Sequence, residues 1–392
     1  MSVEGHDRRR REPFELTRQD LLKYGLTAGV TTVFFGACGG SDNTASTSTV
    51  KSGQVPKNKP DKLVVRTFGD PYREFFDRTA GASFTKETDI PVEWDTTDTA
   101  ELMTRVRAAI GAGERPPVDA VYGESVQGYL ASVQKLSQKF DPKITTVVAD
   151  SVQTVVQPGA GIPDWSMLGL YTFAGPFNYR KDKVTEKDVS SWLNLWGPAF
   201  HPKTVGVGTQ YYFNAFPVAN AMGITPTEET SSMDPVWAKY KELRPNLLGL
   251  LNDTQITQFL TSGECYVCPA FTANGEAAAK EGAPIGFAVP KEGMCIDRDF
   301  FWMFTNLPPE VQYYTNVLAN HWFSPETQTA MADELGVVPA SPEATLPKKM
   351  ADNPVLYPAT EEELAKNIIL PIPLAAKHIE DWQASYEEAL KG

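Results

Sequence analysis

The sequence is poor in the residues that most often build catalytic and metal centres. Among 392 residues it has only four histidines and four cysteines. The histidines are scattered along the chain, whereas a structural zinc site generally needs four protein ligands. No Gly-x-Ser-x-Gly, His-Glu-x-x-His or Gly-x-Gly-x-x-Gly motif occurs. We therefore expect no cofactor, no resident metal and no enzymatic activity, and we keep one catalytic alternative, a secreted hydrolase that pairs a cysteine with a histidine.

Basic residues are fewer than acidic ones. The chain has 36 Lys and Arg against 49 Asp and Glu, which gives a net charge of −13. From residue 39 onward the counts are 30 and 44, so the net charge of that part is −14. Such a surface repels nucleic acid and attracts cations by its long-range field. We expect no nucleic-acid partner and favour a cationic solute, although an acidic surface that serves only solubility would have the same composition.

Long hydrophobic runs are also missing, but the first 38 residues have the layout of an export signal. A run of four arginines precedes a semi-apolar stretch, Leu21 to Ala37, that is a poor transmembrane helix because it contains two glycines and several threonines. The stretch "LTRQDLLKYG" resembles a twin-arginine export signal, and "FGAC" resembles the bacterial lipobox. We expect an export signal over 1–38 and a lipid anchor at Cys38, the alternative being an ordinary buried cysteine.

After Cys38 the chain changes character twice. Residues 39–60 are rich in Gly, Ser, Thr, Asn, Lys and Pro and have no apolar period, which predicts a flexible linker. From residue 61 on, short extended runs alternate with helical stretches, which is typical of an α/β protein. The stretch "KLVVRTFG" is predicted to be a strand, "PVDAVYGES" another, and Asp98 is predicted to cap the helix that follows it. Because ligands of open α/β sheets bind at the carboxyl ends of strands, the loops after Arg66 and Tyr122 are candidate binding loops.

Several segments carry a resemblance to a known family. "VSSWLNLWGPAFHPKTVGV" resembles the Ser-Trp-x-x-Leu-Trp-x-Pro segment of extracellular solute-binding proteins of ABC importers, in the spermidine/putrescine-binding branch. "FLTSGECYVCPAFTANGEAAAKEGAPIGFAVPKEGMCIDRDFFW" and "FSPETQTAMADELGVVPASPEA" are similar to later segments of the same family, in the same order. The likeness covers nearly all of residues 61–392.

The resemblance implies a two-lobed α/β fold, the type II periplasmic-binding-protein fold, with a ligand cleft between lobes that are joined by crossing strands. It places lobe 1 at 61–168 and about 299–342, and lobe 2 at 169–298 and about 343–392. Hinge closure around a solute is the motion expected of such a receptor. The implied partners are a small cationic ligand and a membrane permease, and the protein is expected to be an anchored monomer on the periplasmic or extracellular face of the cytoplasmic membrane.

The resemblance also suggests the ligand site. Asp299 corresponds to the family's ammonium-binding aspartate, and Asp297 stands where the family has a tryptophan. Gln210 takes a position where a carboxylate is usual, and Trp165 keeps a family aromatic. Carboxylates that pair with ammonium groups, and rings that add cation–π attraction, suit a polyamine-like ligand, while the missing tryptophans leave another organic cation, an amino acid or a metal as alternatives. The expected ligand contacts are Phe68, Asp70, Glu124, Trp165, Gln210, Asp297 and Asp299.

Three cysteines follow Cys38. Cys265 and Cys268 form a Cys-x-x-Cys motif that is compatible with a redox pair, half of a metal site or part of a disulfide. The resemblance places Cys268 and Cys295 on strands beside the cleft, so we expect any disulfide to join Cys295 to Cys265 or Cys268. A bridge from Cys265 to Cys268 is disfavoured, because side chains alternate along a strand and these two would point to opposite faces.

Overall fold

The computed structural model describes residues 52–391, so the predicted export signal and Cys38 lie outside the described residues. In the described part, eight strands form a first sheet with the order β12-β5-β11-β3-β1-β2, and two short strands pair with β11 off this path. Its strands are β1 (Leu63–Arg66), β2 (Val92–Asp95), β3 (Ala120–Glu124), β4 (Ser137–Gln138), β5 (Leu168–Ala174), β11 (Cys295–Phe304), β12 (Val338–Pro339) and β13 (Ile368–Ile369).

A second sheet of five strands has the order β10-β6-β9-β7-β8. Strands β7, β8 and β9 pair in parallel, while β6 pairs antiparallel with both β9 and β10. The apolar side chains of β6 and β7 are buried, which agrees with strands covered on both faces. Its strands are β6 (Phe177–Arg180), β7 (Val205–Gly208), β8 (Leu247–Leu251), β9 (Val267–Pro269) and β10 (Ile285–Ala288).

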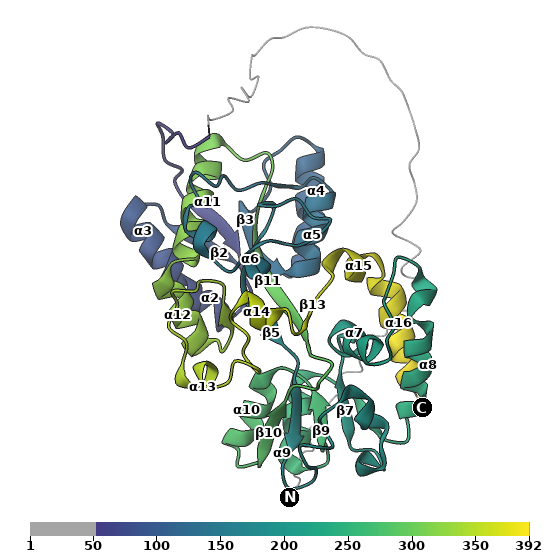
Figure 1. The fold of residues 1–392 in the computed structure, drawn as a ribbon. Helices are drawn as coiled ribbons and strands as arrows, with labels where there is room; N and C mark the ends of the chain where they lie inside the picture. Colours follow the sequence, from purple (N-terminus) through teal and green to yellow (C-terminus); the bar gives the residue numbers. More distant parts are fainter. Residues whose placement is uncertain (1–51, 392) are drawn as a thin grey trace, which may run out of the picture. The chain divides into compact units, whose positions relative to one another are not determined.

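The chain passes between the two sheets twice, once between β5 and β6 and once between β10 and β11 (Figure 1). Strand β11 has ten residues and pairs with both β3 and β5, so it lies inside the first sheet. Its Phe300, Phe301 and Trp302 are fully buried. The residues nearest its N-terminal end therefore lie at the point where the chain has just returned from the second sheet.

Helices cover the sheets and supply the walls near the crossings (Figure 1). Among residues 52–391, no helix has both the length and the apolar character needed to cross a membrane. The helices are α2 (Tyr72–Phe76), α3 (Ala82–Thr88), α4 (Thr99–Gly111), α5 (Ser125–Val133), α6 (Gln153–Val156), α7 (Tyr211–Ala221), α8 (Asp234–Leu243), α9 (Asp253–Ser262), α10 (Thr272–Lys280), α11 (Pro309–Trp322), α12 (Pro325–Glu334), α13 (Lys348–Ala351), α14 (Glu361–Leu364), α15 (Ile372–Lys377) and α16 (Ile379–Leu390).

The last two helices connect the two parts of the fold. Helix α15 packs against α5, which covers the first sheet, and α16 packs against α8 and β8 of the second. Trp382 and Tyr386 of α16 are fully buried, so this amphipathic helix fills the core of the second part. The C-terminal segment therefore contributes to both parts of the molecule.

Local sequence signals explain where several helices begin. The predicted cap at Asp98 is confirmed, because its carboxylate accepts hydrogen bonds from the main-chain N–H groups of Ala100 and Glu101 at 3.0 and 3.2 Å. Helix α9 begins with a reciprocal capping box between Asn252 and Gln255. Such caps fix the ends of helices that border the cleft.

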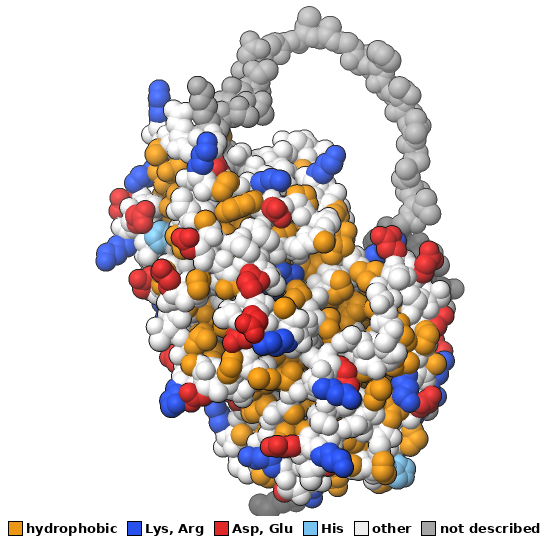
Figure 2. Space-filling view, viewed as in Figure 1, with side chains coloured by type: hydrophobic (Ala, Val, Ile, Leu, Met, Phe, Trp, Pro, Cys, Tyr) orange, Lys and Arg blue, Asp and Glu red, His pale blue; other side chains and the backbone are white. Residues whose placement is uncertain are grey.

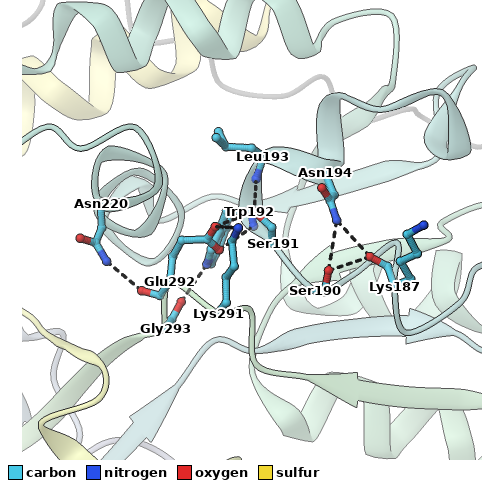
Figure 3. A network of polar contacts seen from close by, with 10 residues as sticks. All are labelled: Lys187, Ser190, Ser191, Trp192, Leu193, Asn194, Asn220, Lys291, Glu292 and Gly293. Atoms are coloured by element: carbon cyan, nitrogen blue, oxygen red, sulfur yellow. Dashed lines mark hydrogen bonds and ion pairs between the residues drawn. The ribbon is translucent and has the colours of Figure 1, made fainter.

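Two of the segments that carry the family resemblance meet in space (Figure 3). Glu292 accepts hydrogen bonds from Ser191 Oγ at 2.6 Å and from the main-chain N–H of Trp192 at 3.1 Å. The indole N–H of Trp192 donates to the carbonyl of Gly293 at 2.8 Å, and Asn220 donates to the carbonyl of Glu292 at 2.9 Å. These contacts hold the loop that leads from β10 back into β11.

The predicted disulfide is wrong. Cys265, Cys268 and Cys295 are all unbonded. Cys295 is on β11 in the first sheet, and its side chain belongs to a different apolar cluster from the one that contains Cys265 and Cys268. The expectation failed because β9 and β11 belong to different sheets, a fact that the spacing of the cysteines in the sequence does not reveal.

Candidate functional site

A cavity of about 360 Å³ lies at the crossings between the two sheets. Strands β3, β5 and β11 supply residues on one side, while the start of α7 and the start of α10 supply residues on another. Segments 335–338 and 356–358 complete the lining. Five predicted ligand contacts are among the lining residues, and their role in binding stays a prediction: Phe68, Glu124, Gln210, Asp297 and Asp299.

Alternation along β11 brings two carboxylates into the cavity. Asp297 and Asp299 are two residues apart in the strand and both line the cavity. Arg298, between them, is directed elsewhere and donates to the main-chain carbonyls of Thr154 and Gln157 at 2.7 and 2.8 Å. The sequence Asp-Arg-Asp therefore puts two acids in the cavity without putting the arginine there.

Asp299 is held by two tyrosines. The hydroxyl of Tyr171 donates to Asp299 Oδ2 at 2.6 Å, and that of Tyr122 approaches the same oxygen at 3.4 Å. The strands β3 and β5 flank β11, so Asp299 pairs with Glu124 on one side and with Tyr171 on the other. Burial raises the pKa of Asp299 to about 8, and the neighbouring carboxylates Asp297 and Glu124 add to the rise against the Tyr171 hydrogen bond.

Asp297 has a more stabilised negative charge. Its Oδ2 accepts a hydrogen bond from Ser125 Oγ at 3.2 Å, and its Oδ1 accepts one from the main-chain N–H of Arg298 at 2.8 Å. Burial raises the pKa of Asp297 to about 6, although these hydrogen bonds and the Arg298 charge lower it. Nearby, Thr99 Oγ1 donates to Glu124 Oε2 at 2.9 Å. The cavity therefore has three carboxyl groups with different environments.

No lysine or arginine of residues 52–391 lines this cavity. Arg66 is buried, and its guanidinium donates to the main-chain carbonyls of Tyr122 and Thr97 at 3.0 and 3.1 Å while it lies 4.7 Å from the centre of the Phe68 ring. On the outer surface, by contrast, Figure 2 shows basic and acidic side chains interspersed. The excess of carboxylates over cations is thus a property of the cavity and not only of the composition.

Aromatic side chains form much of the remaining lining. Phe68 and Tyr72 contact each other, with ring centres 5.6 Å apart, and Phe173 and Phe271 contact each other at 5.5 Å. Apart from Phe68, the sequence analysis missed these residues as ligand contacts. Strand alternation could have suggested Tyr171 and Phe173, which pair with Asp299 and Asp297. The lining aromatics are Phe68, Tyr72, Tyr171, Phe173, Tyr212, Phe271 and Tyr357.

The side of the cavity that belongs to the second sheet carries no carboxylate. Gln210, Tyr212 and Thr272 line it there. Gln210 and Phe271 also line a smaller cavity of about 110 Å³ next to the main one, and this smaller cavity contains Asp253. The two sides of the cleft thus differ in charge as well as in origin.

Two predicted ligand contacts do not line the main cavity. Asp70 forms an exposed ion pair with Arg73, with Oδ1 and Nε 3.1 Å apart. Trp165 packs against the core of the first sheet, with a positive φ of 66°. Among residues 52–391, no group of three or more His, Cys, Asp and Glu side chains is arranged to hold a metal ion.

The chain matches relatives among well-characterised proteins. It is 28% identical to spermidine/putrescine-binding periplasmic protein 1 of Haemophilus influenzae over 44% of this chain, which is about half (48%) of that protein. It is 23% identical to the spermidine/putrescine-binding periplasmic protein of Escherichia coli over 71% of this chain and 79% of that protein.

Solved structures share the fold. An ABC transporter protein from Clostridium perfringens superposes with a TM-score of 0.69 at 15% identity, over 84% of this chain and all of that one. The spermidine/putrescine substrate-binding protein of Streptococcus pneumoniae gives a TM-score of 0.67 at 14% identity, over 85% of this chain and all of that one. The predicted α/β fold, two-lobed and of the type II periplasmic-binding-protein class, is confirmed. The family model for bacterial extracellular solute-binding proteins matches residues 79–358, and the chain belongs to that family.

Proposed function

We propose that the cavity binds a small, polyamine-like organic cation and that its ammonium group pairs with Asp299. The observation that carries this proposal is the lining of residues 52–391, which has three carboxylates and no lysine or arginine. A charge-assisted hydrogen bond from an ammonium group to a carboxylate is about twice as strong as a neutral one. A cation also relieves the repulsion among Glu124, Asp297 and Asp299, so its charge is rewarded where an anion would be opposed.

The aromatic lining supports the same class of ligand. Rings within about 6 Å of a cation attract it, with about 0.5–2 kcal/mol per contact. The methylene groups of an organic cation would also be buried against Phe173, Phe271 and Tyr212. A free metal ion gains little from such rings, and this favours an organic cation over the metal alternative.

The curated relatives are named for spermidine and putrescine binding, which supports a polyamine-like ligand. In this chain, however, the side of the cavity near Gln210 and Thr272 has no carboxylate. One strongly paired ammonium group and a second, weakly paired end are therefore expected. Putrescine and monoamines of similar length are the first ligands to test.

Members of this family bind a solute and deliver it to the permease of an ABC importer. We include in the proposal that the protein acts as a monomer attached to the membrane by a lipid on Cys38, which lies outside the described residues. Stable attachment requires more than one acyl chain, because a single chain binds only marginally. In fractionated cells, Cys38→Ser should move the protein from the membrane to the soluble fraction, and continued membrane retention would remove the anchor from the proposal.

The hydrolase alternative has no support from the histidines of the described part. The imidazole of His321 contacts Ser83 Oγ at 2.9 Å and Glu87 Oε2 at 3.3 Å, and that of His378 contacts Thr230 Oγ1 at 3.3 Å. Neither histidine is hydrogen-bonded to a cysteine. A Cys–His pair is therefore not the reason for the Cys-x-x-Cys motif.

A thermal-shift screen tests the proposed ligand class. A ligand that binds only the folded state raises its apparent stability, by about 2.7 kcal/mol at a concentration of 100 Kd. We expect putrescine, spermidine or a monoamine of similar length to raise the melting temperature, and glutamate, citrate and phosphate to leave it unchanged. A shift with an anion and none with any cation would contradict the proposal.

A further inference from the structure

Cys265 and Cys268 lie together in a small apolar cluster of the second part of the molecule. Both side chains are fully buried, and the cluster also contains Leu251, Ile256 and Leu260. Its other buried members are Ala270, Ala278 and Ile285. No histidine or carboxylate belongs to the cluster, so a metal site is excluded as the reason for the two cysteines.

The two sulfur atoms occupy the space above Gly206 of β7. A β-carbon built on Gly206 would lie 3.1 Å from Cys265 Sγ and 3.2 Å from Cys268 Sγ, so both sulfurs border the same point. That β-carbon would also lie 2.7 Å from Leu251 Cδ1. The missing side chain of Gly206 therefore leaves the room in which the two sulfurs meet.

The alternation argument against this pair fails for a local reason. Strand β9 begins only at Val267, so Cys265 precedes the strand, and the chain bends at Tyr266. The thiol of Cys265 folds back and donates to the carbonyl of Val267 at 3.2 Å. Both side chains therefore reach the same side of the sheet although they are three residues apart.

We propose that Cys265 and Cys268 become joined by a disulfide when the protein folds in an oxidising compartment. Disulfides form and persist outside the cytoplasm, and this chain belongs to an extracellular family. A low-molecular-weight disulfide such as oxidised glutathione is a sufficient oxidant. One cysteine thiolate attacks it and releases one glutathione thiol, then the second cysteine displaces the other glutathione, so two cysteine thiols are oxidised and one glutathione disulfide becomes two thiols.

The bridge would fix the entry into β9, which leads directly to the cavity. Phe271, three residues after Cys268, lines the main cavity. Because only two residues separate the cysteines, the closed loop is short and the bridge removes little entropy from the unfolded chain. The count of free thiols is therefore a sharper readout than the melting temperature.

The test uses a Cys38→Ser chain, which keeps three cysteines. The protein is refolded either with reduced glutathione or with a mixture that contains oxidised glutathione, then unfolded in guanidinium and alkylated. We expect three alkylated cysteines after reduction and one after oxidation. No lysine or arginine lies between the two cysteines and Lys280, so the tryptic peptide that ends at Lys280 should be unalkylated and about 2 Da lighter than its dithiol form.

Cys295 is the internal control, because it is also fully buried but lies in another cluster and should be alkylated under both conditions. Cys268→Ser, refolded in the oxidising mixture, should leave Cys265 alkylatable or carrying a single glutathione. Alkylation of both Cys265 and Cys268 in the oxidised parent, or a link that includes Cys295, would overturn the proposal. The parent chain alone decides the question if the variant does not fold.

Discussion

The two sides of the cleft differ in charge although they face the same cavity. The side built on β3, β5 and β11 presents Glu124, Asp297 and Asp299, while the side built on the starts of α7 and α10 presents Gln210 and Thr272. Three acids that repel one another are costly without a partner, whereas the neutral side costs nothing when empty. The difference indicates that the charged side selects the ligand and that the neutral side closes over the rest of it.

Removing the charge at Asp299 should have the largest effect. Asp299→Asn keeps the shape of the side chain but deletes the carboxylate that we propose as the ammonium partner. We expect affinity for the cation to fall by about 2–5 kcal/mol, which is the range for breaking one side of a buried charged pair. Isothermal titration calorimetry measures this loss.

Asp70→Asn is the matched control, because Asp70 is an exposed carboxylate paired with Arg73 outside the cavity. Its affinity should stay within about 0.5 kcal/mol of the parent value, as is usual for surface changes. Equal affinity of Asp299→Asn and the parent would show that the charged side does not select the ligand.

The empty protein should be stabilised by the same substitution, in a pH-dependent way. The pKa of Asp299 is raised from 3.8 to about 8 on folding, so the folded state holds a proton that the unfolded chain releases. The associated stability is fully present below about pH 4 and is lost as the pH rises to about 8. We expect Asp299→Asn to gain about 1–3 kcal/mol over the parent between pH 5 and pH 8.5, less than the 1.4 kcal/mol per pKa unit of an isolated group.

Urea unfolding of the ligand-free parent and of Asp299→Asn, at pH 5 and pH 8.5, measures this difference. A stability advantage of the variant that shrinks as the pH rises would contradict the raised pKa. Ser125→Ala offers a comparison, because it removes a hydrogen bond from Asp297 and leaves Asp299 unchanged.

A smaller effect is expected on the neutral side. Gln210→Glu places a carboxylate where only neutral groups line the cavity, and an acid is tolerated there because Gln210 precedes the first turn of α7. We expect putrescine to gain about 1 kcal/mol, as its second ammonium group acquires a partner, and a monoamine of equal length to gain less. The ratio of the two affinities, measured by calorimetry, reports the charge of this side alone.

Gln210→Ala is the control for lost contacts and should weaken both amines similarly. If Gln210→Glu changed the affinities for the diamine and the monoamine by the same factor, the second end of the ligand would not lie near this side of the cavity.

The sequence predicted the acidic strand of the site but not its neighbours. Asp297 and Asp299 could be placed together because residues two apart share a face of a strand. Tyr171 and Phe173 were missed because they lie on β5, more than 120 residues earlier, and only the pairing of β5 with β11 brings them to the acids. Strand pairing is a long-range property that a single sequence does not encode visibly.

Other differences have local causes. Asp70 follows a predicted strand, as a binding residue should, but Arg73 lies one turn further on and captures its carboxylate. Trp165 keeps a family aromatic in sequence, yet its ring packs against the core of the first sheet. The cap at Asp98 was predictable because capping depends on neighbours three residues away.

The central claim is that a cation binds to Asp299 in its ionised form. Because the pKa of Asp299 is about 8 in the empty protein, most molecules carry a proton there at pH 7, and the bound cation must displace it. Calorimetric titration of putrescine, or of the cation that binds best in the screen, in two buffers of different ionisation enthalpy at pH 7 measures the protons released. We predict that about one proton leaves the parent per cation bound and that almost none leaves Asp299→Asn. Binding by the parent without proton release, or with proton uptake, would contradict the account.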